Sequence, residues 1–110
     1  VPVREGLVVI NADRITKENM PSIFEDWEII PITKNEMAEQ SFYKYPYASN
    51  YIGLNFLSIN PQLVICDPKQ EYLRSELQKR GVESIGVDLR HSRTLGGGHH
   101  CVTLDMQRVL

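Results

Sequence analysis

The stretch QLVICDPKQEYLRSELQKRGVESIGVD, residues 62–88, decides the fold because it places a strand, a helix and a second strand in succession. Asp67 suits the N-cap of that helix, Pro68 its first position and Gln70 its third. Gly81 suits the C′ position, at which helices commonly stop. These residues predict a helix between Asp67 and Gly81.

Two further patterns in the same stretch predict an α/β unit. Leu73 and Leu77 are four residues apart and therefore share one face of the helix. Short apolar runs at 63–66 and 82–88 flank the helix, as expected for buried strands. Cys66, at the end of the first run, is expected to be a small buried hydrophobic residue.

The same order of elements occurs about 56 positions earlier, counted from Leu7 to Leu63. GLVVINADR, residues 6–14, predicts a strand closed by a polar turn, and EIIPI, residues 28–32, predicts a second strand. The chain is therefore predicted to be α/β, with two similar modules side by side. A hairpin-like pair of runs within 51–66 favours mixed sheets over a purely parallel one.

Three other segments carry weaker patterns. Ser22 and Glu25 have the spacing of a capping box, which predicts a short helix. Residues 33–50 are polar and then aromatic, which indicates a long connection, and residues 50–59 have the bulky, alternating character of a strand. Residues 101–110 also alternate and predict a last strand, whose apolar face is Val102, Leu104 and Met106.

The composition is that of a globular protein. The 110 residues have a net charge of −2, with 42% hydrophobic and 24% charged residues, so we expect neither disorder nor a basic surface for nucleic acid. No apolar run approaches the roughly 20 residues that span a bilayer, so no membrane contact is expected. Two cysteines cannot form a disulfide scaffold, which favours a reducing, cytoplasmic location. Val1 in place of Met is compatible with a processed chain or a piece of a longer one.

The stretch LGGGHHCVTLD, residues 95–105, combines three consecutive glycines with two histidines and a cysteine. A tight turn before the last segment is one interpretation. A phosphate-binding loop is excluded, since no Gly-Lys-Ser/Thr and no helix follow it. The adjacent residues His100 and Cys101 would point to opposite faces of a strand, and zinc-site spacings are absent. We therefore expect no metal, and expect the histidines to hold the loop.

A nucleophilic cysteine is the remaining interpretation. The thiolate is the attacking form, and a cysteine beside a glycine turn is accessible to a substrate. A cationic substrate would itself favour the thiolate. From the residues alone, the turn and the nucleophile both stay open.

Four segments resemble the amidinotransferases, a family of guanidine-modifying enzymes that includes glycine and inosamine-phosphate amidinotransferases. GGGHHCVTLDMQR, residues 96–108, is similar to their GGG-x-His-Cys-x-Thr run, which carries the nucleophile. Residues 6–14 are similar to a family strand that ends in Asn-x-Asp-Arg. SNYIGLNFLSIN, residues 49–60, resembles a Ser-x-Trp-Leu-Ser-Met-Asn segment, and residues 87–98 resemble the approach to the cysteine. The resemblance thus extends over nearly the whole chain.

The resemblance implies a pentein-like fold, a five-bladed α/β propeller of ββαβ-type modules. This chain would be its C-terminal part, with modules at about 1–45 and 46–110. It also implies that Cys101 attacks the guanidinium carbon of arginine or another guanidino substrate, and that an amine acceptor then takes the amidino group. Arg14 and Ser49 would bind substrate, and no cofactor is implied.

The same resemblance implies parts that this chain lacks. The acid/base histidine and the guanidinium-binding carboxylates of the family precede the point where this chain begins, so missing upstream blades or a partner chain would supply them. Open strand edges would also favour a homo-oligomer. Ala48, Tyr51 and Gly53 depart from the family's serine, tryptophan and serine. A deiminase-type guanidine hydrolase using the same cysteine and a non-catalytic domain of the same fold are therefore kept as alternatives.

Overall fold

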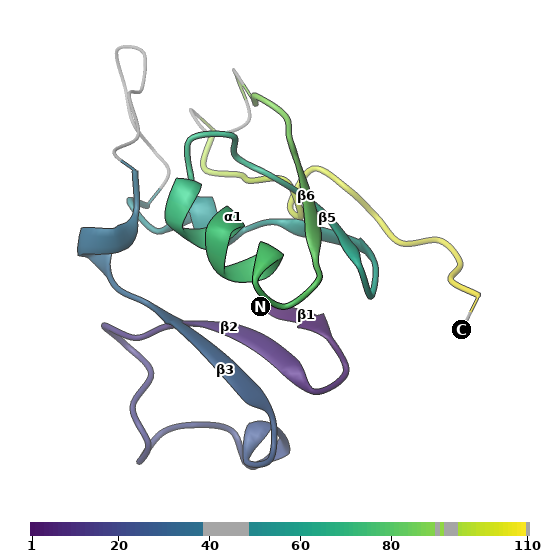
Figure 1. Ribbon diagram of the computed structural model, residues 1–110. Coiled ribbons are helices and arrows are strands. Elements are labelled where there is room, and N and C mark those ends of the chain that lie inside the picture. Colours follow the sequence, from purple (N-terminus) through teal and green to yellow (C-terminus); the bar gives the residue numbers. More distant parts are fainter. Residues whose placement is uncertain (39–48, 90, 92–94, 110) are drawn as a thin grey trace.

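The computed structural model describes residues 1–38, 49–89, 91 and 95–109, which form two three-stranded sheets and one α-helix (Figure 1). In each sheet the first pair of strands is antiparallel and the second pair is parallel. The prediction of an α/β chain with mixed sheets is confirmed. The first sheet consists of β1 (Pro2–Arg4), β2 (Leu7–Asn11) and β3 (Glu28–Ile32), and the second of β4 (Leu57–Asn60), β5 (Leu63–Cys66) and β6 (Glu83–Gly86).

The helix α1 spans Glu71–Gln78 and connects β5 to β6. Its end is the predicted one: Gly81 has a φ of +73°, and the N–H of Val82 donates to the carbonyl of Leu77 at 3.0 Å. Its start differs from the prediction, because a turn at Asp67 precedes the helix and Gln70 occupies the cap position. In the described part of the chain, neither α1 nor another helix is long and apolar enough to cross a membrane.

The capping box predicted for Ser22 and Glu25 is wrong. Ser22–Phe24 is a single 3-10 turn, the extended Pro21 occupies its cap position, and no side chain caps it. The N–H of Glu25 instead donates to the carbonyl of Ser22 at 3.1 Å. The segment that joins β2 to β3 is therefore mostly irregular, where the second sheet has an α-helix.

The strand predicted for residues 50–59 is only partly correct. Its first half folds as a 3-10 helix, Ile52–Leu54, and only Leu57–Asn60 pairs with β5 in the expected hairpin. Gly53 fits this close packing, because a Cβ at this position would lie 2.5 Å from the side-chain amide of Gln70. The 3-10 turn brings this backbone against the residue that precedes α1. In the long connection after β3, Lys34–Glu36 forms a 3-10 helix and residues 39–48 lie outside the described ranges.

The strand predicted for residues 101–110 is wrong for the nine of them that the structure describes. Residues 101–109 begin with a turn and then run without regular structure to the C-terminal end (Figure 1), and the Arg108 guanidinium donates to the carbonyl of Ser58 in β4 at 2.8 Å. A strand needs a neighbouring strand for its backbone hydrogen bonds, and none of the six described strands pairs with this segment. Its apolar side chains are correspondingly exposed, with Leu104 at 85% and Met106 at 92%.

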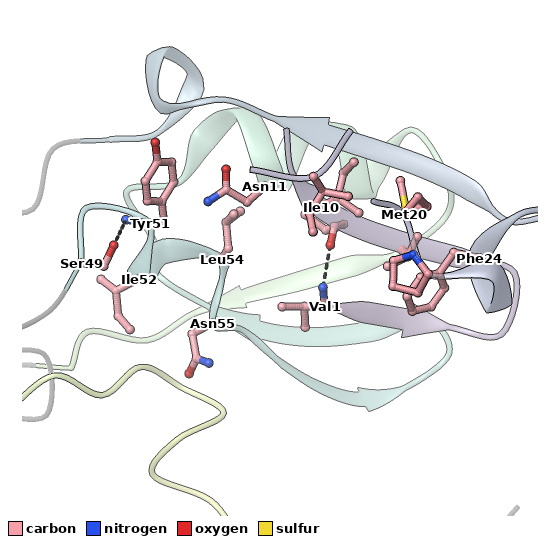
Figure 2. Close-up of a pocket in the computed structure, with 14 residues that line it drawn as sticks. Val1, Ile10, Asn11, Met20, Phe24, Ser49, Tyr51, Ile52, Leu54 and Asn55 are labelled. Carbon is pink, nitrogen blue, oxygen red and sulfur yellow. Dashed lines mark hydrogen bonds between the residues drawn. The ribbon is translucent and has the colours of Figure 1, made fainter. Parts of the chain in front are cut away.

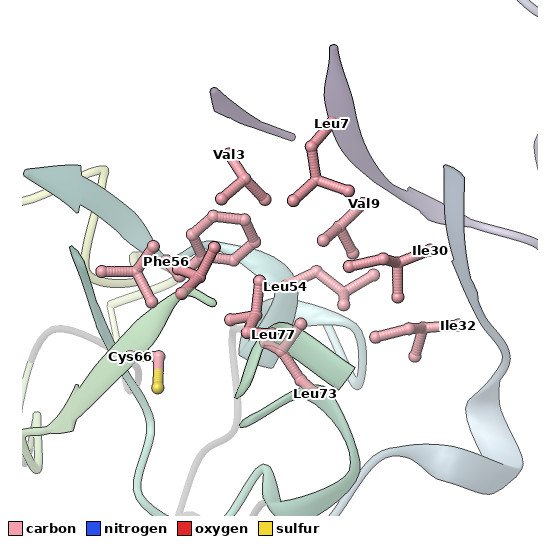
Figure 3. Close-up of a cluster of buried hydrophobic side chains, with 12 residues drawn as sticks. Val3, Leu7, Val9, Ile30, Ile32, Leu54, Phe56, Cys66, Leu73 and Leu77 are labelled. Atoms are coloured by element: carbon pink, nitrogen blue, oxygen red, sulfur yellow. The ribbon is translucent and has the colours of Figure 1, made fainter. Parts of the chain in front are cut away.

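One hydrophobic core joins the two sheets. Figure 3 shows side chains from β1, β2 and β3 meeting those of α1, β5 and the segment before β4. Leu73 and Leu77 supply the predicted apolar face of α1, and Cys66 is fully buried as expected. The core residues are Val3, Leu7, Val9, Ile30, Ile32, Leu54, Phe56, Val64, Cys66, Leu73, Leu77 and Val82.

Candidate active site

Cys101 lies exposed on a turn whose backbone is held by Asn55. The side-chain oxygen Oδ1 of Asn55 accepts the N–H of Cys101 at 3.0 Å and the N–H of His100 at 3.1 Å. The backbone carbonyl of Asn55 accepts the same His100 N–H at 3.2 Å. The N–H of Val102 closes the turn by donating to the carbonyl of Gly98. The thiol of Cys101 is thus free and accessible on a fixed piece of backbone.

Two of the three consecutive glycines have a structural explanation. Gly96 has a φ of +90°, a conformation that residues with a Cβ rarely adopt. At Gly98, a Cβ would lie 2.7 Å from both the Cβ and the Oδ1 of Asn55, closer than real Cβ contacts. The glycines therefore let the backbone before Cys101 turn and approach Asn55.

His99 is a structural residue, as the sequence predicted. Its ring is buried, and Nε2 lies 2.6 Å from the carbonyl oxygen of Val87. Because a carbonyl can only accept, this nitrogen carries the proton, and the bond ties the turn to the end of the second sheet. His91 and His100 are exposed. Across the described ranges, no three histidine, cysteine or acidic side chains gather as metal ligands would.

Arg14 and Tyr51 come together at the end of β2. The Arg14 guanidinium lies 5.3 Å from the centre of the Tyr51 ring, within the range of a cation–π contact. The Tyr51 hydroxyl donates to Oδ2 of Asp13 at 2.9 Å, and this hydrogen bond raises the pKa of Tyr51. Asp13 also accepts the N–H of Lys34 at 2.7 Å. The contact with Tyr51 orients an exposed arginine, whose planar guanidinium can bind a carboxylate with two hydrogen bonds.

Ser49 contacts the backbone of Tyr51. Its Oγ accepts the N–H of Tyr51 at 3.2 Å, and Ser49, Tyr51 and Asn55 all line one cavity of about 420 Å³ (Figure 2). The opposite wall is mainly apolar and comes from β2 and the segment after it, including Ile10, Met20 and Phe24. Arg14 and Ser49 thus both contact Tyr51, Arg14 through the ring and Ser49 through the backbone N–H. Neither Arg14 nor Cys101 is among the described residues that line the cavity, but Asn55, which accepts the Cys101 N–H, does line it.

Sequence reasoning missed two residues of this site, Asn55 and Asp13. Asn55 lies within an apolar run that was predicted as a strand, and its polarity among apolar neighbours was the available signal. Of the other residues predicted to matter, Ala48 lies outside the described ranges. Cys66 is a second thiol, but its burial raises its pKa, which disfavours the reactive thiolate.

Comparison with known proteins identifies relatives over nearly the whole chain. No family model matches. The chain is 43% identical over 109 residues to inosamine-phosphate amidinotransferase 1 of Streptomyces griseus, covering 98% of this chain and 31% of that protein. It is 31% identical over 108 residues to L-arginine:L-lysine amidinotransferase of Pseudomonas savastanoi pv. phaseolicola, covering 98% of this chain and 29% of that protein.

A solved structure agrees with these matches. The inosamine-phosphate amidinotransferase structure from Streptomyces griseus superimposes with a TM-score of 0.87 at 43% identity, over 98% of this chain and 31% of that one. The chain therefore spans about a third of the length of the relatives it matches. The predicted resemblance is confirmed: the relatives of this chain are amidinotransferases, and it corresponds to about a third of such an enzyme.

Proposed function

We propose that this chain is the C-terminal part of an amidinotransferase, which moves an amidino group from arginine to an acceptor amine through Cys101. The observation that carries the proposal is the position of Cys101. Its thiol is exposed on a turn fixed by Asn55, which also lines the cavity that Ser49 borders. The relatives support the reaction class, since one of them is named as an arginine-to-lysine amidinotransferase.

The proposed reaction has two steps that share one intermediate. The Cys101 thiolate attacks the guanidinium carbon of arginine, the bond from that carbon to the side-chain nitrogen breaks, and ornithine leaves after its nitrogen takes a proton. The acceptor amine then attacks the same carbon, loses a proton and displaces the thiolate. Arg14 would pair with a substrate carboxylate, and Ser49 would donate a hydrogen bond at the same end.

The proton transfers are assigned to the rest of the protein. A positioned acid/base contributes about 10²- to 10⁴-fold to such reactions. The His99 ring is engaged with Val87, and the described hydrogen bonds of His100 are made by its backbone, so neither is assigned this role. We infer that the remaining part of the protein, or a partner chain, supplies the acid/base and the groups that bind the guanidinium.

The same proposal extends to the architecture. We propose that residues 1–45 and 46–110 are two ββαβ-type modules of a five-bladed propeller. The repeated strand order of the two sheets supports this assignment. The exposed segment 101–109 would then find its neighbours in the rest of the protein.

Product analysis of the full-length protein tests the function. With arginine and an amine acceptor, we expect ornithine and an amidinated amine from the wild type and neither product from Cys101→Ser. Cys66→Ala is the matched control, because it removes the other thiol but keeps a small apolar side chain at this core position, and it should leave turnover in place. Ammonia with a ureido product would instead show the hydrolase. Turnover by Cys101→Ser would contradict the assignment of the nucleophile.

A further inference from the structure

We infer that Asn55 is the positioning residue for Cys101, an assignment that rests on the proposed function of this cysteine. The side-chain oxygen of Asn55 is the acceptor of the Cys101 N–H, at 3.0 Å. It accepts the His100 N–H as well, at 3.1 Å, so one oxygen fixes two consecutive backbone groups. The nucleophile's backbone is thereby held from a segment far away in the sequence.

Asn55 is itself rigidly supported, which a positioning residue requires. It comes directly after the 3-10 helix Ile52–Leu54, and its own N–H donates to the carbonyl of Ile52 at 2.9 Å. Its neighbours Leu54 and Phe56 are buried in the core, with Phe56 fully inaccessible. A displacement of Asn55 would therefore require movement of core side chains, so its oxygen is a fixed reference point for the turn.

The approach of the turn to Asn55 is equally specific. Gly98 faces Asn55 so closely that a Cβ would meet its side chain at 2.7 Å. Asn55 thus occupies the space left by the missing side chain and accepts the N–H groups of the residues at 100 and 101. Asn55 and Gly98 act as a pair, and the pair holds the Cys101 backbone against a residue that also lines the cavity with Ser49 and Tyr51.

Positioning has a kinetic consequence that differs from substrate binding. A nucleophile displaced by about 1 Å loses on the order of 10²-fold in rate, although the substrate still binds. Arg14 and Ser49, not Asn55, are proposed to bind the donor. The loss of the Asn55 oxygen should therefore slow formation of the Cys101 intermediate and leave the KM for arginine nearly unchanged.

The test uses three variants of the full-length protein. Asn55→Ala removes the accepting oxygen, and Asn55→Asp keeps an oxygen in the same place. Asn60→Ala is the matched control, because the Asn60 oxygen also accepts a backbone N–H, that of Gln62 at 2.8 Å, but at the β4–β5 turn. We expect Asn55→Ala to form the intermediate about 10- to 100-fold more slowly, with the KM for arginine within about threefold. Asn55→Asp should recover most of the rate, and Asn60→Ala should match the wild type.

Amide hydrogen exchange separates this inference from the proposed function. In Asn55→Ala the Cys101 N–H should lose its protection, whereas the His100 N–H keeps the backbone carbonyl of residue 55 as an acceptor. If the wild type forms no intermediate with arginine, the proposed function fails. Selective loss of exchange protection at the Cys101 N–H in Asn55→Ala would still show that Asn55 positions the Cys101 backbone. Unchanged Cys101 exchange, or a wild-type rate of intermediate formation in Asn55→Ala, would overturn the inference. A raised KM with an unchanged maximal rate would overturn it too, since Asn55 would then bind substrate.

Discussion

The two sheets of this protein use the same turn for different purposes. At the end of β2, the Asn11 side chain accepts the N–H of Asp13 at 3.1 Å, and just after β5, the Asp67 side chain accepts the N–H of Lys69 at 3.1 Å. The next residue repeats the match, because the N–H groups of Arg14 and Gln70 donate to the carbonyls of Asn11 and Asp67, each at 3.1 Å.

The segments that leave these two turns differ completely. Gln70 is only 2% exposed and leads into α1, whereas Arg14 is exposed on the ring of Tyr51 and leads into an irregular segment. The second copy of the turn leads into a helix that packs in the core, and the first copy presents an exposed arginine to the Tyr51 ring. One backbone pattern thus precedes a buried residue in one sheet and an exposed, charged residue in the other.

Removing the Gln70 side chain should have the largest effect on stability. Its oxygen accepts the N–H of Ala38 at 3.1 Å, its nitrogen donates to Asp67 at 3.0 Å, and the side chain packs on Gly53. We expect Gln70→Ala to lower the free energy of unfolding by roughly 2–3 kcal/mol, from lost hydrogen bonds and a new cavity. Urea unfolding of the full-length protein measures it. A loss under about 0.5 kcal/mol, the range of surface substitutions, would refute a structural role for this turn.

Gly53→Ser tests the packing of Gln70 on Gly53 by enlarging the other residue of the pair. The new Cβ would meet the Gln70 amide at 2.5 Å, so the core must shift. Overpacking of this kind costs about 1–3 kcal/mol, and we expect a loss in that range by thermal or urea unfolding. Combining Gly53→Ser with Gln70→Ala should give less than the sum of the two losses. Strict additivity would show that the two residues do not compete for this space.

Arg14→Gln tests the other copy of the turn. Because Arg14 is exposed, its replacement should change the unfolding free energy by less than about 0.5 kcal/mol. Loss of the two hydrogen bonds proposed between the Arg14 guanidinium and the substrate carboxylate should raise the KM for arginine by about tenfold or more. Steady-state kinetics with ornithine detection would measure this change. Lys69→Gln, at a different position of the equivalent turn, serves as the control. An unchanged KM would remove Arg14 from the substrate site.

The smallest effect is expected at Glu76, on α1. A hydrogen bond from Arg80, at 2.8 Å, lowers the pKa of Glu76 from its ordinary value of 4.5. The charged form therefore stabilises the fold above pH 4.5, and this contribution is lost as the pH falls through the lower pKa of the folded state. We expect the unfolding midpoint of Glu76→Gln to fall less between pH 5 and about pH 3 than that of the wild type. A midpoint that falls equally in both proteins would show that the ion pair contributes nothing.

The sequence predicted the elements whose causes are local. Gly81 ends α1 through its own backbone conformation, and Leu73 and Leu77 define the buried face by spacing alone. The spacing between Leu7 and Leu63 predicted the repeat. The last strand failed because pairing depends on a neighbour, and the alternation of residues 101–109 says nothing about where that neighbour lies.

The site depended on contacts between distant segments. The triple glycine and Cys101 were visible as a motif, but the reason for Gly98 is Asn55, which the sequence placed in a strand. Arg14 and Gln70 occupy equivalent turn positions, and their opposite burial is set by the residue that packs on each one: Gly53 makes room for Gln70, and Tyr51 orients Arg14.

The most direct test of the central claim is to follow the guanidino carbon itself. The full-length protein is incubated with arginine labelled with ¹³C at that carbon, quenched in acid during turnover, digested and analysed by mass spectrometry. The account predicts a labelled amidino group on the peptide containing Cys101, none on the peptide containing Cys66, and no labelled peptide from Cys101→Ser. Turnover without label on Cys101, or label on another residue, would contradict it.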